Sequence, residues 1–187
     1  MECYPGLVRL STIDKEGIKR FADSFEWDEQ ALGCVTSIKT KEGSNLVFLY
    51  LDRSTLICLT ISNLRKIEKK WETKVSSKGQ QAGRGAQEFQ CMSMNFLETQ
   101  RVLLLGGQQN KILAFNIDSS KKIGEFISTG LSTNNNITSI AASDKHYYFI
   151  TSGKTQDCDV TIWRWNQKMS SLSSLQTKPF EEEIPID

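Results

Sequence analysis

The chain has a single histidine, His146, among its 187 residues. A metal centre that needs two histidines is therefore excluded, and a serine–histidine–aspartate arrangement has only one candidate base. His146 follows Asp144 and Lys145, and aspartate is common in turns, so the sequence predicts an exposed turn residue. No other titratable groups converge, and we expect no catalytic, cofactor-binding or metal site.

The chain also lacks an excess of positive or negative charge, and it lacks long apolar segments. The 23 lysines and arginines nearly balance the 22 aspartates and glutamates, so no overall field directs the chain to nucleic acid or to a membrane. No apolar run approaches the roughly 20 residues that cross a bilayer. The N-terminus lacks the basic and apolar segments of a secretory signal. We therefore expect a cytoplasmic or nuclear protein without a membrane partner.

The five cysteines are an odd number and include no C-x-x-C pair. Cys34 and Cys58 lie inside apolar runs, and Cys91 begins another. Such cysteines behave as small apolar residues in a reducing compartment. We expect them to be buried in a core.

What the chain does contain is a short β-rich unit that recurs three times. Each copy has a strand, a turn, a second strand, a tight turn and a third strand, and the copies lie at 45–61, 101–118 and 147–165. Repeats of about 40–50 residues with four short strands are typical of a β-propeller. The sequence therefore predicts an all-β fold whose units serve as a binding platform.

The repeats also predict how the chain is divided. Residues 1–29 hold a partial blade, seen as its last two strands, and a connector. Residues 30–175 hold three blades with a flexible insertion at 76–88, and residues 176–187 form a tail. Closed rings usually have about four to eight blades, so this ring is incomplete and leaves blade faces and strand edges open. We favour a fragment of a longer protein over a chain that closes a ring with a partner or is poorly stable alone.

Two segments allow more than one interpretation. Leu64, Ile67 and Trp71 have helical spacing, but a polar outer strand fits the repeat better, and we favour the strand. Trp27 lies between charged residues in a connector, where it can be an exposed binding anchor or pack on a blade edge. We favour packing. Trp163 and the residue two positions later, Trp165, should share the inner side of one strand.

The segment that begins at Ser152 and ends in Val-Thr-Ile-Trp-Arg resembles the WD-repeat family. The resemblance implies a hydrogen-bond network that joins Trp163 to the hydroxyl of Ser152 and to Asp157 or Asp159, with an upstream histidine. Two departures from the family pattern are clear. Arg164 replaces the terminal aspartate, and no Gly-His pair precedes this unit.

A narrower resemblance rests on residues 104–118. Their double glycine, the turn at Gln109 and Asn110, and the spacing to Leu113 are similar to a blade of the propeller in catalytic subunits of poly(A)-nuclease deadenylation complexes. The resemblance implies a non-enzymatic scaffold in an mRNA deadenylation complex, with a pseudokinase-like adaptor and messenger RNA as partners. The nuclease domain of that family has no counterpart here.

Two alternatives stay open. Residues 103–118 followed by 137–146 are also similar to propellers of BTB-domain adaptors, which recruit partners to signalling or ubiquitin-ligase assemblies. An RNA-contacting module is the other, because basic residues surround Trp71. They are Lys66, Lys69, Lys70, Lys74, Lys78 and Arg84. Solvated charge is the simpler interpretation of this stretch, so other proteins in a multi-subunit complex are the expected partners.

Overall fold

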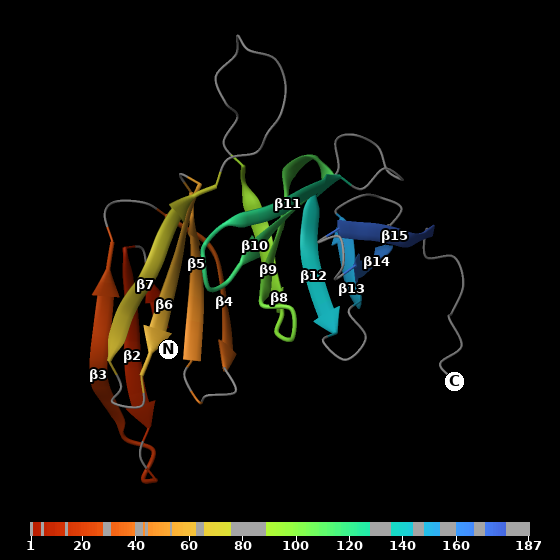
Figure 1. The fold of residues 1–187 in the computed structure, drawn as a ribbon. Coiled ribbons are helices and arrows are strands. Elements are labelled where there is room, and N and C mark those ends of the chain that lie inside the picture. The colour runs from red at the N-terminus through yellow and green to blue at the C-terminus, as the bar shows by residue number, and fades with distance from the viewer. Residues whose placement is uncertain are drawn as a thin grey trace. The chain divides into compact units, whose positions relative to one another are not determined.

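The structure is a computed structural model, and it describes most of the chain. The described residues are 2–4, 6–13, 15–27, 31–39, 43, 45–52, 54–62, 66–75, 89–127, 136–143, 148–153, 160–166 and 171–178. Across them, fifteen strands form four antiparallel sheets (Figure 1), which confirms the predicted all-β fold. The chain divides into two compact units, residues 1–76 and 77–187.

The first unit holds two sheets whose strands follow one another in chain order. The first sheet has three strands: β1 (Glu2–Tyr4), β2 (Leu7–Ile13) and β3 (Lys19–Glu26). The second has four: β4 (Leu32–Lys39), β5 (Asn45–Leu51), β6 (Thr55–Ile61) and β7 (Ile67–Lys74). The strand interpretation of the segment around Trp71 is confirmed, because Trp71 lies within β7 and pairs with Cys58 of β6.

The first sheet has one strand more than the two predicted from the sequence. β1 pairs with residues 7–9 of β2, and Gly6 makes the turn between them with φ of 75°. Glycine adopts this left-handed conformation at little steric cost. A strand of three residues is too short to show an alternating pattern, so β1 could not be recognised from apolar spacing.

The core of the first unit lies between its two sheets. Val8 of β2 packs with apolar residues of β5 and β6, and these are Val47, Leu49, Leu51, Ile57 and Leu59. The other faces of β5 and β6 are also buried, as Phe48 and Cys58 show. This confirms the prediction that the continuous apolar run before residue 52 forms a strand buried on both sides.

A carboxylate joins the outer strands of these two sheets. Asp23 of β3 accepts hydrogen bonds from the backbone N–H of Ile67 at 2.7 Å and of Ser24 at 2.9 Å. The bond from Ile67 is the main reason that the pKa of Asp23 lies below its ordinary value of 3.8, and the bond from Ser24 adds to it. The ionised carboxylate therefore stabilises the folded unit.

We predict that Asp23→Asn lowers the free energy of unfolding at neutral pH and has no such effect in acid. A lowered folded-state pKa stabilises the protein above the unfolded pKa, and this contribution is lost as the pH falls through the folded value. Urea midpoints of both proteins at pH 7 and at successively lower pH values below 3.8 measure the difference. Glu26→Gln, an exposed change on the same strand, is the control. A difference that does not shrink as the pH falls contradicts the prediction.

The second unit also holds two four-stranded sheets in chain order. The first comprises β8 (Cys91–Leu97), β9 (Val102–Gly107), β10 (Lys111–Asn116) and β11 (Lys122–Ile127). The second comprises β12 (Ile137–Ser143), β13 (Tyr148–Gly153), β14 (Val160–Asn166) and β15 (Ser171–Lys178). The sequence-based boundary at residue 175 lies inside β15. Cys58 and Cys91 are buried and Cys34 is partly buried.

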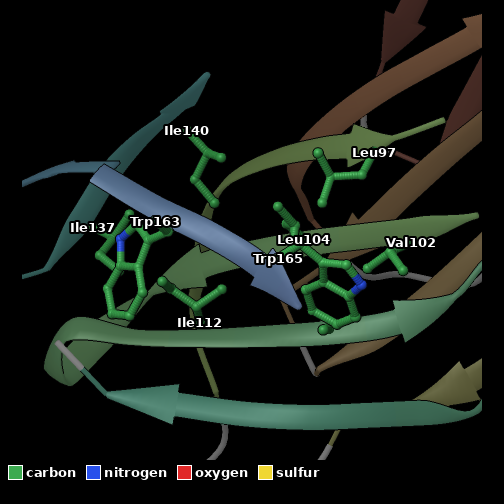
Figure 2. Close-up of a cluster of buried hydrophobic side chains, with 9 residues drawn as sticks. Leu97, Val102, Leu104, Ile112, Ile137, Ile140, Trp163 and Trp165 are labelled. Carbon is green, nitrogen blue, oxygen red and sulfur yellow. The ribbon is translucent and has the colours of Figure 1, made fainter. Parts of the chain in front are cut away.

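The core of the second unit is built on two indole rings. Trp163 and Trp165 of β14 lie on the same side of the strand and pack toward Leu104 and Ile112 (Figure 2), with 3% and 4% of their surface exposed. Phe126 of β11 meets Trp165 edge to face, with ring centroids 6.3 Å apart. The predicted inner-facing position of both tryptophans is confirmed.

Side chains of β8 also tie the two sheets of this unit together. Ser93 Oγ accepts a hydrogen bond from the backbone N–H of Ile140 at 3.0 Å. Asn95 Nδ2 donates to the carbonyl oxygen of the same residue, also at 3.0 Å. Both backbone groups of Ile140 are thus satisfied by the neighbouring sheet, which fixes the position of β12 against β8.

Candidate interaction surface

Large apolar side chains are exposed at seven places in the described residues. They are Ile13, Ile18, Phe21, Val35, Met92, Ile127 and Ile150. Single exposed apolar residues are normal on a protein surface, whereas a group of them marks a binding site. Three of the seven, Ile13, Ile18 and Phe21, come from the β2–β3 hairpin and are 73%, 50% and 63% exposed.

The pairing of β2 with β3 explains which face this hairpin presents. Phe21 pairs with Ser11, and Lys19 pairs with Ile13, so these side chains lie on one face of the sheet. Val8 projects from the opposite face of β2 and is completely buried in the core. Among the described residues, the face of the first sheet that carries Val8 is therefore covered, whereas the face that carries Ile13 and Phe21 leaves these two apolar side chains exposed.

The exposed face also carries positive charge. The Arg9 guanidinium lies 5.8 Å from the ring centroid of Phe21, within the range of a cation–π contact. Lys19 is exposed on the same face, beside Ile13. We call Arg9, Ile13, Lys19 and Phe21 of this face, together with Ile18 of the connection between β2 and β3, the hairpin patch. It combines three exposed apolar side chains of one hairpin with two cations.

Another sheet with an open face lies in the second unit. Ile150 of β13, 42% exposed, pairs with Ile162 of β14. Because Ile162 is adjacent to Trp163 in a strand, it projects away from the tryptophan core. Arg164 is exposed on this same face. The face has fewer exposed apolar side chains than the hairpin patch, so we regard it as the weaker candidate.

Trp27 is not an exposed anchor. It is partly buried and packs against the core of the first unit, as Phe25 and Leu32 also do. Its backbone N–H donates to the carbonyl oxygen of Gly6 at 3.0 Å. The preference for packing over exposure is confirmed.

The predicted WD-type hydrogen bond uses a different hydroxyl. Trp163 Nε1 donates to Thr151 Oγ1 at 2.9 Å, and not to Ser152 as the motif implied. Register is the reason: Thr151 pairs with Thr161, two residues before Trp163, and so faces the tryptophan side of the sheet. Ser152 pairs with Val160 and faces the other side. The predicted partners Asp157 and Asp159 lie outside the described residues, and so does His146, which the sequence predicted as an exposed turn residue.

Part of the charge of the basic stretch around Trp71 is offset by an acidic residue of the same strand. Lys69 forms an exposed ion pair with Glu72 at 3.0 Å, and Lys74 Nζ donates to Thr55 Oγ1 at 2.7 Å. Trp71 is partly buried and its ring lies 6.0 Å from that of Phe48. Lys66 and Lys70 are exposed, while Lys78 and Arg84 lie outside the described residues. The described part of this strand offers no array of exposed aromatic rings for bases to stack on.

Among the described residues, no group of three or more histidine, cysteine, aspartate or glutamate side chains is arranged to hold a metal ion. Within the same part of the chain, no helix has the length and apolar character that crossing a membrane requires.

Comparison with known proteins identifies the architecture. No family model matches the chain, and no curated protein matches its sequence. Among solved structures, a putative 6-phosphogluconolactonase from Bacteroides uniformis matches with a TM-score of 0.67 and 12% identity, over 93% of this chain and 52% of that one. Sqt1 from Saccharomyces cerevisiae matches with a TM-score of 0.65 and 13% identity, over 98% and 47%.

A structure described as the WD40 repeats of RRP9 matches with a TM-score of 0.57 and 14% identity, over 81% of this chain and 39% of that one. The chain thus spans about half or less of the length of these structures. Identities this low indicate a shared fold and not a shared activity. With its successive four-stranded antiparallel sheets, the chain has the fold of an incomplete, WD-repeat-like β-propeller.

Proposed function

We propose that this chain is a non-enzymatic scaffold that binds other proteins, and that the hairpin patch is its main contact surface. The observation that carries the proposal is the exposure of Ile13, Ile18 and Phe21 in one hairpin beside Arg9. Aromatic residues and arginine are the side chains that most often dominate the energy of protein interfaces. Leaving this group in water is unfavourable, and a bound protein removes that cost.

The proposal extends to the kind of assembly. The similarity of residues 104–118 to the deadenylase propeller makes an mRNA deadenylation complex the first assembly to examine, in the cytoplasm or nucleus. The propellers of BTB-domain adaptors give the second. Direct RNA contact through β7 is the third possibility. The ion pair between Lys69 and Glu72 disfavours RNA contact, because the pair neutralises positive charge that would bind phosphates.

Native purification tests the scaffold proposal. We expect an affinity-tagged full chain recovered from cells to carry at least one protein in constant stoichiometry, and to keep it after ribonuclease treatment. A chain that elutes alone, or one whose partner is lost with the RNA, contradicts the proposal. A chain that carries Ile127→Ser, an exposed change far from the hairpin in sequence, controls for non-specific apolar binding.

The likeness to putative 6-phosphogluconolactonases calls for a separate assay. We expect the purified chain to leave the hydrolysis of 6-phosphogluconolactone at its uncatalysed rate. A turnover that scales with the concentration of the chain would overturn the non-enzymatic proposal, whatever the purification shows.

A further inference from the structure

We infer that the outer edge of β7 is protected against pairing with a further strand, and that this protection is the role of the charged residues around Trp71. An edge strand exposes backbone N–H and C=O groups with which another chain can pair. Three features of β7 counter such pairing: a carboxylate bound to its backbone, an extra residue in its pairing with β6, and a series of exposed charges. This role goes beyond the proposed scaffold function and does not depend on it.

β7 is a strand for which such protection matters. In the described residues it lies at one edge of the second sheet and pairs only with β6. No described strand is longer than its eight residues. A long edge offers more backbone groups to another chain than a short one, and proteins often keep edge strands short for this reason.

A side chain of the first sheet occupies one hydrogen-bond donor of this edge. The backbone N–H of Ile67, the first residue of β7, donates to Asp23 Oδ2 at 2.7 Å. β3, which carries Asp23, lies beside β7 (Figure 1). A hydrogen bond to an ionised carboxylate is stronger than one to a neutral acceptor. A strand that added at this end of β7 would have to displace Asp23 and lose that bond.

The pairing of β7 with β6 is irregular at its centre. Lys69 pairs with Leu59 and Trp71 pairs with the adjacent Cys58, so Lys70 is an extra residue. Such a bulge bends the strand and increases its twist, which disturbs the spacing that a further strand needs. The last strand of each other sheet also has one extra residue against its neighbour, and these residues are Ala22, Ile123 and Leu175.

Charged side chains make up most of β7. Five of its eight residues are exposed lysines or glutamates, and these are Glu68, Lys69, Lys70, Glu72 and Lys74. The paired strands β5 and β6 have no charged residue. A further strand would remove water from these ionised groups, which is costly whether or not they form ion pairs within the chain.

The mixture of signs separates this role from RNA binding. Glu68 and Glu72 lie among the lysines of the strand, and carboxylates repel the phosphates of RNA. Protection of an edge has no such requirement, because charge of either sign opposes the burial of the strand. The basic stretch is therefore explained without a nucleic-acid ligand.

Removal of the charges tests the inference. The variant that combines Lys69→Thr, Lys70→Thr and Glu72→Thr keeps residues that suit a strand but carry no charge. In sedimentation velocity over about 1–200 µM, we expect it to self-associate at a concentration at least tenfold lower than the unchanged full chain. In the associated form, the backbone amides of residues 67–74 should exchange with deuterium more slowly than in the monomer, because they pair with a second chain.

Two further variants serve as controls. The combination of Lys15→Thr, Glu16→Thr and Lys121→Thr removes the same charges from exposed turn positions, and it should change the association by less than about twofold. The combination of Lys69→Arg, Lys70→Arg and Glu72→Asp keeps the charges of β7 and should associate as the unchanged chain does. Thermal unfolding of each variant shows whether it is folded.

Two results would overturn the inference. One is a folded threonine variant that associates no more than the unchanged chain, and the other is an associated form in which residues 67–74 exchange as fast as before. If the threonine variant does not fold, Lys70→Thr alone decides: it should lower the association concentration about threefold, and no change contradicts the inference. The scaffold proposal is unaffected by either result, because the hairpin patch lies on β2 and β3.

Discussion

Replacing Gly107 with alanine is expected to destabilise the second unit by about 3 kcal/mol or more, because the added methyl group has no space. A Cβ at this position would overlap the backbone carbonyl oxygen of Gln90 and would lie 2.8 Å from the Phe89 ring. The carbonyl belongs to the backbone and accepts a hydrogen bond from Gln108 N–H at 3.3 Å. Relief of the clash therefore requires the chain before β8 to move away and to lose this bond.

Urea unfolding followed by circular dichroism measures the effect. Gly17→Ala is an informative control, since Gly17 has φ of 80° but nothing within 4 Å of the position of a new Cβ. Its cost should be limited to backbone strain, about 1 kcal/mol. If Gly107→Ala costs no more than Gly17→Ala, the close approach of Gln90 is not a feature of the folded protein.

The neighbouring glycine, Gly106, also has no space for a side chain. A Cβ at Gly106 would lie 2.5 Å from Cγ2 of Ile137, a residue of the adjacent sheet. The double glycine at the end of β9 therefore lets two different segments pack directly on the strand backbone. This is a structural role, and it does not depend on the partner of the protein.

Replacing Trp163 with alanine is expected to cost about 3–5 kcal/mol, the usual range for removal of a large aromatic side chain from a core. The ring is 97% buried and packs against residues of both sheets of the second unit, among them Leu104 and Ile137. Its loss leaves a cavity between the sheets and also leaves the Thr151 hydroxyl without the indole N–H.

Thr151→Val separates the hydrogen bond from the packing. Valine keeps the shape of threonine but cannot accept the indole proton, so we expect a loss of about 1–3 kcal/mol. Thr151→Ser keeps the hydroxyl and should retain part of that bond. The mutant Ser152→Ala should have little effect, since Ser152 lies on the other face. A larger effect at residue 152 than at residue 151 would contradict the observed register.

The sequence predicts the position of several strands, but it does not predict which face of a strand each side chain lies on. Alternating and continuous apolar runs located β4, β5 and β6 correctly, because each run matches the burial of its strand. The motif-based choice of Ser152 was wrong, because the similarity placed a hydroxyl by its distance from a glycine and not by strand pairing. A one-residue difference in a strand places a side chain on the opposite face.

The residues of the hairpin patch could not be identified from the sequence. The repeat count predicted that some blade faces would be open, but it did not identify which residues would lie on them. Ile13 and Phe21 have the same apolar character as Val8, which is buried. Only the register of β2 with β3 shows that they belong to the uncovered face, and register is a tertiary property that a single strand does not encode.

The most direct test of the account is a photo-crosslinking experiment on the full chain in cells. A photoreactive phenylalanine analogue placed at position 21 should crosslink to a protein partner, and the same analogue at the exposed position 35 should not. The account predicts that the crosslink from position 21 decreases at least severalfold with Arg9→Gln, because Arg9 contacts Phe21. Crosslinks of equal yield from both positions, or none from position 21, would contradict the claim that this face is where the protein binds its partner.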